Sequence, residues 1–316
     1  MLTRRQFFLT GSLAMAVTGK LTSKERVNRA LQGADVDRPP FSLWHHFRLQ
    51  DFPGERHAAA TLEFHRKFRT DIVKVMSDFP YPKPAGGIEA IKPEANPFPE
   101  QLRALDIIRE GLAGRNYFVE TVFNPYNQAQ KTFSKPEVQR LKQEQPQVLL
   151  DALEAIAESE VNHVRKALGA GAAGIFLAID CAVPGVLTPE EYAKFSEPFD
   201  RMVLDAASGA HFNILHLHGD KVYLDLFWKG WPPAVINYES HLTGVDFAAA
   251  RRQFSGVLMG GVDEVNYRTL SEAEIARQWH AAAAAAGKKY ILTPGCSVPD
   301  NSTDEELIRL AHVVGA

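Results

Sequence analysis

The stretch from residue 174 to residue 220 reads GIFLAIDCAVPGVLTPEEYAKFSEPFDRMVLDAASGAHFNILHLHGD. Its two ends, residues 174–180 and 212–217, are short apolar runs with the length and composition of buried strands. Between them, TPEE at residues 188–191 supplies an N-cap, a proline for the first turn and acids for the positive helix end, which predicts a helix over residues 189–207. A strand, a helix and a second strand in this order predict a parallel sheet.

The same alternation continues along the chain from Leu21. Eight short runs are candidate strands: residues 41–44, 72–77, 117–122, 174–180, 212–217, 234–238, 257–261 and 289–293. Helical patterns fill most of the gaps: residues 101–110, 147–168, 189–207, 247–254, 272–286 and 304–314. Eight such repeats predict a single α/β domain, a (β/α)8 (TIM) barrel over residues 21–316. The short connection at residues 218–233 predicts a distorted unit around the fifth and sixth strands.

Composition narrows the class of protein. The chain has 316 residues, of which 45% are hydrophobic and 23% charged, and α/β barrels of this length form one domain. A net charge of −3, with lysine and arginine scattered along the chain, gives no expectation of nucleic-acid binding. Two cysteines are too few for a disulfide framework. No internal stretch approaches the roughly 18 apolar residues of a membrane helix, so we expect no stable membrane insertion.

The first twenty residues differ from the rest. Arg4 and Arg5 precede an apolar group at residues 7–9, and a small-residue run with a cleavage candidate follows at residues 14–16. This order is typical of a bacterial twin-arginine export signal, which predicts a periplasmic or exported protein. The alternative is an amphipathic N-terminal helix of a cytoplasmic protein.

Barrel enzymes carry their chemistry at the carboxyl ends of the strands. We expect Asp78, Asp180 and Glu239 to position substrate or move protons. The residues expected to contact substrate are Trp44, His45, His46, Asn124, Tyr126, Asn237 and Asp263. Loops are usually polar, and this alone accounts for many of the acidic residues at the strand ends. Loop polarity explains less readily why both cysteines and several histidines fall at strand ends.

Two histidines and a cysteine form the candidate metal site. His216 and His218 are two residues apart in a strand, so their side chains point to the same face. Cys296 lies in the turn TPGCSVP, after the last strand. Zinc prefers imidazole and thiolate ligands, and a catalytic zinc site has about three of them with one position open. These three residues are therefore predicted zinc ligands; the alternative is a pair of hydrogen-bonded strand-end histidines.

Several segments resemble one known superfamily. TSKERVNRALQGADVDRPP (residues 22–40) is similar to the opening of many uroporphyrinogen decarboxylase superfamily members, and DIVKVMSDF (71–79) resembles the segment carrying the decarboxylase's substrate-binding aspartate, here Asp78. DCAVPGVLTPEEYAKFSEPF (180–199) is similar to a loop of the zinc-dependent corrinoid methyltransferase branch. ILHLHGD (214–220) and TPGCSVP (293–299) resemble that branch's two zinc-binding segments. The resemblance runs from about Leu21 to the C-terminus and implies a (β/α)8 barrel.

The chain also departs from both branches. Where the decarboxylase has an arginine-rich loop, residues 45–51 read HHFRLQD, and histidine lacks arginine's permanent charge and bidentate fork. Where the methyltransferases have the cysteine of their His-x-Cys segment, this chain has His218. The decarboxylase in turn has histidine at the position of Cys296. The methyltransferase branch is therefore the better match, with an altered ligand set.

The resemblance implies zinc-dependent methyl transfer, in which the metal activates a thiol or related nucleophile of a small-molecule substrate. In the related enzymes the methyl group comes from a corrinoid, so a corrinoid protein is an expected partner. The alternative is cofactor-independent decarboxylation of uroporphyrinogen or another pyrrolic acid. A third possibility is an exported binding protein without turnover.

Overall fold

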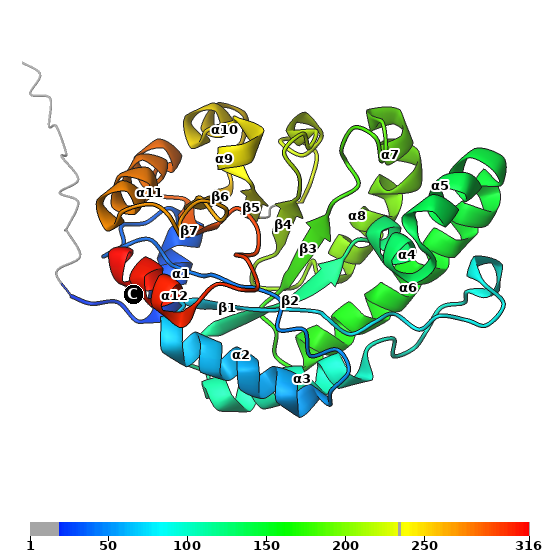
Figure 1. The fold of residues 1–316 in the computed structure, drawn as a ribbon, viewed down its shortest axis with the longest axis horizontal. Coiled ribbons are helices and arrows are strands. Elements are labelled where there is room, and N and C mark those ends of the chain that lie inside the picture. The colour runs from blue at the N-terminus through cyan, green and yellow to red at the C-terminus, as the bar shows by residue number, and fades with distance from the viewer. Residues whose placement is uncertain (1–18, 233–234, 316) are drawn as a thin grey trace, which may run out of the picture.

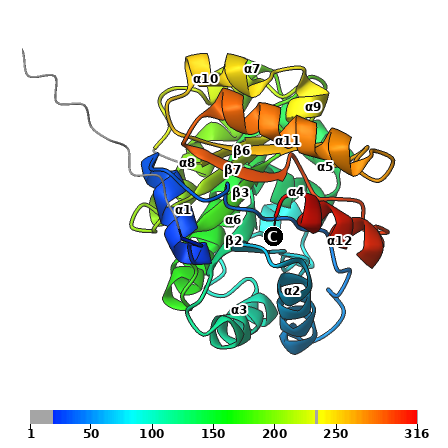
Figure 2. The same cartoon turned by 90° about the vertical axis from the view of Figure 1, so that its left-hand side faces the viewer.

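The computed structural model describes residues 19–232 and 235–315. Parallel strands form the inside of the molecule, and helices cover their outer side (Figure 1). Figure 2, turned by 90°, shows helices around β2, β3, β6 and β7. Arg4 and Arg5 of the predicted export signal lie outside the described residues. In the part that the structure describes, no helix is long and apolar enough to cross a membrane.

In the described part of the chain, seven strands form one curled, wholly parallel sheet in the order β1-β2-β3-β4-β5-β6-β7. Their bounds are β1 Ile72–Val75, β2 Tyr117–Phe123, β3 Ile175–Ile179, β4 Ile214–Leu217, β5 Val235–Tyr238, β6 Val257–Val262 and β7 Tyr290–Pro294. Nearly every strand residue is buried, because helices cover one face and side chains fill the other. The predicted α/β class and parallel sheet are confirmed, and the fold resembles a TIM barrel.

The prediction of eight strands is wrong. The first candidate, residues 41–44, forms only an isolated parallel bridge between Phe41 and Leu292 of β7. On the side of β1, the Asp71 N–H donates to the Phe41 carbonyl at 2.6 Å. Phe41 thus connects the two edges of the sheet, β7 and the start of β1, through single hydrogen-bonded positions. The next hydrogen bond of this ladder would run from residue 294 to the Ser42 carbonyl, and Pro294 has no N–H to donate, so the pairing stops there.

Twelve α-helices connect or cover the described strands. They are α1 Ser23–Gln32, α2 Gly54–Phe68, α3 Pro99–Leu112, α4 Pro125–Phe133, α5 Lys135–Glu144, α6 Pro146–Gly169, α7 Pro189–Phe195, α8 Glu197–Ala206, α9 Ser240–Thr243, α10 Phe247–Gln253, α11 Glu272–Ala286 and α12 Asp304–Val313. Thr188 caps α7 and forms a capping box with Glu191. The helix predicted over residues 189–207 is divided at Ser196, because Pro198 begins a new first turn there.

The connection after β4 is short, as the sequence indicated. Its described part, residues 218–232, contains the 3-10 turn η2 (Leu224–Leu226) and no α-helix. Gly219 begins it with φ 111°, a conformation that favours glycine. The chain therefore turns sharply beside His218 and leaves the end of β4 open.

Candidate active site

A pocket of about 210 Å³ lies at the carboxyl ends of the strands. Six predicted site residues line it: Trp44, His46, Asp180, His216, His218 and Cys296. We call it the mouth pocket. It has room for roughly seven water molecules at about 30 Å³ each, the size of a small organic substrate.

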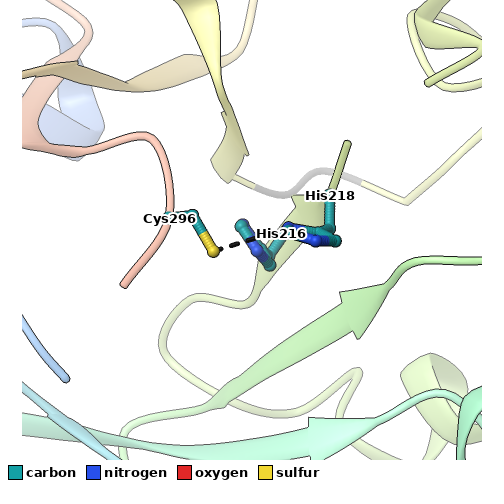
Figure 3. Close-up of side chains that lie close together, drawn as sticks. All are labelled: His216, His218 and Cys296. Atoms are coloured by element: carbon teal, nitrogen blue, oxygen red, sulfur yellow. Dashed lines mark hydrogen bonds between the residues drawn. The ribbon is translucent and has the colours of Figure 1, made fainter. Parts of the chain in front are cut away.

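The structure brings the three predicted metal ligands together (Figure 3). His216 is in β4, His218 follows that strand, and Cys296 follows β7. One nitrogen of each imidazole and the sulfur all lie within 4.8 Å of one another. The Cys296 Sγ atom is 3.5 Å from the Nδ1 atom of His218. Residues that are 78 positions apart in the sequence thus meet at one end of the sheet.

A buried amide sets the orientation of His216. Asn237 of β5 donates through its Nδ2 atom to the carbonyls of Met259 and Pro294, both at 3.1 Å. Its Oδ1 atom must therefore accept, and the Nδ1–H of His216 donates to it at 2.6 Å. This tautomer leaves the Nε2 lone pair of His216 free to bind a metal. Asn237 was predicted to contact substrate; its observed contact is with His216.

Glu239 and Cys296 both lie against His218. The Glu239 carboxylate is 2.8 Å from His218 Nδ1 and is almost completely buried. Hydrogen bonds to Cys296 and Glu239 raise the pKa of His218 to about 11. Burial alone would raise the pKa of Cys296, but its contacts with His216 and His218 and the positive charge of His218 outweigh burial and lower that pKa to about 5. Cys296 is therefore a thiolate at neutral pH, the form that binds metals.

Gly295 lets the loop after β7 approach β5 closely. A Cβ atom on Gly295 would lie 2.6 Å from the Cα atom of Glu239 and 3.0 Å from the Tyr238 carbonyl. Its N–H donates to Glu264 at 2.9 Å. Only glycine fits at this position, and it fixes the next residue, Cys296, over the end of the sheet.

Asp180 and Lys74 also line the mouth pocket, and only Asp180 was predicted from the sequence. Asp180, predicted from its place after β3, has a buried Oδ1 atom without a hydrogen-bond partner among the described residues. Lys74 of β1 was not predicted, because it lies within an apolar strand and not at its end. Its burial in such a strand was the available signal. Burial lowers the pKa of Lys74 to about 7.

Asp78 and His46 form a hydrogen bond at the rim. His46 Nδ1 is 2.6 Å from Asp78 Oδ1, and the Phe47 N–H donates to Oδ2 at 3.3 Å. Burial alone would raise the pKa of Asp78, but the bond and charge of His46 lower it. His45 points the other way, packs against Phe47 and Phe64, and does not line the mouth pocket.

The predicted site residues Asn124, Tyr126 and Asp263 lie outside this pocket, as do Asp78, Asn237 and Glu239. Asn124 caps α4 and donates to Cys181, Ser196 and Asp200, while the buried Tyr126 hydroxyl has no partner among the described residues. Asp263 accepts the N–H groups of the turn that follows β6. The side chains of Asn124, Tyr126 and Asp263 are parts of the supporting structure at the strand ends.

Comparisons with known proteins agree with this architecture. A methyltransferase from Methanosarcina mazei aligns with a TM-score of 0.75 and 18% identity, covering 93% of this chain and 98% of that one. A putative vitamin-B12-independent methionine synthase from Listeria monocytogenes aligns with a TM-score of 0.51 and 12% identity, covering 94% of each chain. At these identities the likeness shows the fold. No curated protein sequence matches the chain.

The family is identified by sequence. Residues 86–316, which include β2 to β7 and all three clustered residues, match the family described as Uroporphyrinogen decarboxylase (URO-D). The match covers well over half of the chain. This protein therefore belongs to the uroporphyrinogen decarboxylase family.

Proposed function

We propose that this chain is a zinc-dependent methyltransferase that acts on a small thiol or related nucleophile. The observation that carries the proposal is the convergence of His216, His218 and Cys296 at the mouth pocket. Two imidazoles and a thiolate are a donor set that zinc prefers, and three protein ligands leave a position for substrate.

The geometry of the cluster fits such an ion. Two nitrogens and a sulfur bound to one tetrahedral zinc lie about 3.3–3.6 Å apart, given the usual zinc–ligand bond lengths. The candidate ligand atoms are already within 4.8 Å of one another, so a contraction of at most about 1.5 Å brings them to bonding positions. A zinc ion held there would lower the pKa of a bound thiol and supply a nucleophile at neutral pH.

The residues around the cluster have separate tasks in this proposal. Asn237 holds His216 in the tautomer that presents Nε2, and Glu239 holds His218. Asp180 has an unpartnered oxygen and accepts the proton of the incoming nucleophile. Trp44 forms part of the apolar wall, in an edge contact with Phe176. The methyl donor, a corrinoid held by a partner protein, approaches at the rim.

Decarboxylation of a pyrrolic acid is the second candidate, since family members carry out that reaction. It requires Asp78 to bind pyrrole N–H groups. Asp78 already accepts bonds from His46 and Phe47, does not line the mouth pocket, and faces no arginine-rich loop.

The test is metal analysis of the purified full-length protein combined with an assay. We expect about one zinc per chain, and loss of zinc when Cys296→Ser and His216→Ala are combined. Cys181→Ser is the matched control and should keep its zinc. Methylcobalamin with a small thiol should then be demethylated by the wild type and by Cys181→Ser, and not by the double variant. Stoichiometric zinc in the double variant would overturn the metal assignment, and coproporphyrinogen formed from uroporphyrinogen would favour the second candidate.

Export through the twin-arginine pathway is also part of the proposal. Replacing Arg4 and Arg5 with lysine should leave the protein in the cytoplasm, because the pathway reads the paired arginines. Fractionation of cells that express each form measures this. An unchanged distribution would show that the N-terminal run is not an export signal.

A further inference from the structure

Lys74 is a buried lysine that reaches the mouth pocket from its floor. Its backbone is in β1, where Lys74 pairs with Val119 and is the last residue but one of the strand. The residue is only 7% exposed, yet it lines the pocket. The amine lies over the Phe176 ring, 4.6 Å from its centre, and 5.5 Å from the centre of the Trp44 ring.

Within the described residues, this amine has no carboxylate partner. No acid among them lies within ion-pair distance, and its one hydrogen-bond acceptor there is the thioether sulfur of Met76, a weak acceptor. Burying an unpaired ammonium group is costly, and ring faces offset only part of that cost. Cys296 and Asp78 attract it from a distance, while Lys131 repels it. A lysine in such a place is fully charged only when a bound molecule supplies the anion that the described residues do not provide.

We infer that Lys74 binds a carboxylate of the substrate at the floor of the mouth pocket. The inference rests on the proposed function and specifies its substrate class: a short thiol acid, with the sulfur at the metal cluster and the carboxylate at Lys74. The ammonium group of Lys74 donates hydrogen bonds to the carboxylate, while Trp44 and Phe176 exclude water from the pair.

The dimensions suit a short molecule. Phe176 stacks on His216 with ring centres 5.0 Å apart, and the Lys74 amine is 4.6 Å from the same Phe176 ring. The amine and the His216 ring centre are therefore no more than about 10 Å apart. A chain of a few carbon atoms spans the remaining space, in keeping with a pocket of about 210 Å³.

The test compares mercaptopropionate with its neutral isostere, mercaptopropionamide. Protein loaded with cobalt(II) in place of zinc reports thiol coordination through its visible spectrum. We expect the acid to bind about ten- to a hundredfold more tightly than the amide. Lys74→Met should abolish that preference and leave affinity for the amide unchanged. Lys131→Met, which removes an exposed lysine over the Phe123 ring, should keep the preference.

Two results distinguish this inference from the proposed function. Equal binding of acid and amide by the wild type would overturn the role of Lys74, even though thiol coordination still supported the metal site. Calorimetry of the metal-free protein with the same two compounds measures the carboxylate contact alone. A preference for the acid that disappears in Lys74→Met supports the inference even if no metal binds. Should Lys74→Met fail to fold, Lys74→Gln compared with the wild type tests the same contact.

Discussion

The two cysteines of this protein lie at the ends of β7 and β3, in opposite environments. Cys296 is partly exposed beside His216 and His218, and its pKa is lowered to about 5. Cys181 is fully buried, and its nearest polar neighbours are the neutral Asn124 amide and Ser196 hydroxyl. Burial raises the pKa of Cys181 well above its usual range.

The difference divides the rim of the sheet into two regions. The rim from β4 to β7 carries ionised groups that surround open space, as a binding site requires. Outside the mouth pocket, near the ends of β2 and β3, Asn124, Ser196 and Asp200 form hydrogen bonds that satisfy one another and enclose Cys181. The first region is arranged for chemistry and the second for stability.

The largest effect expected from this comparison is in alkylation. At pH 7 in chelator-treated protein, iodoacetamide should modify Cys296 at least about a thousandfold faster than Cys181, because thiolate is the reactive form and Cys181 is both protonated and enclosed. The Cys296 rate should rise with pH through about 5 and level off above it, since deprotonation creates the nucleophile. Peptide mass spectrometry measures both rates, and comparable rates would refute the division of the rim.

The second prediction concerns the support of His216. Asn237→Leu removes the oxygen that fixes the imidazole tautomer, so metal affinity should fall about ten- to a hundredfold. Competition with a zinc-binding dye measures the change. Asn124→Leu, the matched change on the other side of the rim, should reduce stability and leave metal affinity intact. Equal metal loss in both variants would mean that Asn237 acts only through folding.

Much of this fold follows from local sequence patterns. Seven of the predicted strands overlap observed strands, because apolar runs flanked by turn residues are a strong signal for a parallel sheet. The prediction failed at residues 41–44, where pairing depends on β7, some 250 residues later, and Pro294 of that strand has no N–H to donate. Likewise, Pro198 divides a run of helical periodicity that otherwise looks continuous.

Sequence patterns also predict part of the candidate site. Residue type and strand-end position brought His216, His218 and Cys296 into one prediction, and the structure places them together. The directions of the side chains could not be predicted from the sequence. His45 and His46 are adjacent, yet one packs against Phe47 and the other reaches Asp78. Lys74 was missed because residues distant in the sequence bury it and place it at the mouth pocket, and no local pattern shows those contacts.

A smaller effect is expected from Gly295→Ala. The added methyl group would meet the backbone of Glu239 and Tyr238, so the loop must move outward by a few tenths of an ångström or more, together with Cys296. We expect metal affinity to fall about tenfold, less than for removal of the ligand itself. Ser297→Ala, next in the same loop, is the control. Wild-type affinity in Gly295→Ala would show that the loop adapts and that the close approach is not required.

The smallest effect tests the stabilising region alone. Cys181→Ser replaces sulfur with a smaller, more polar atom in a closed site between Asn124 and Ser196. It should lower the free energy of unfolding by about 1–2 kcal/mol, as expected for a small cavity with a retained hydrogen bond. Zinc content and thiol binding should stay at the wild-type level, because Cys181 does not line the mouth pocket. Urea titration and metal analysis of one preparation measure both. A loss of metal without a loss of stability would connect the two regions and remove the distinction between the cysteines.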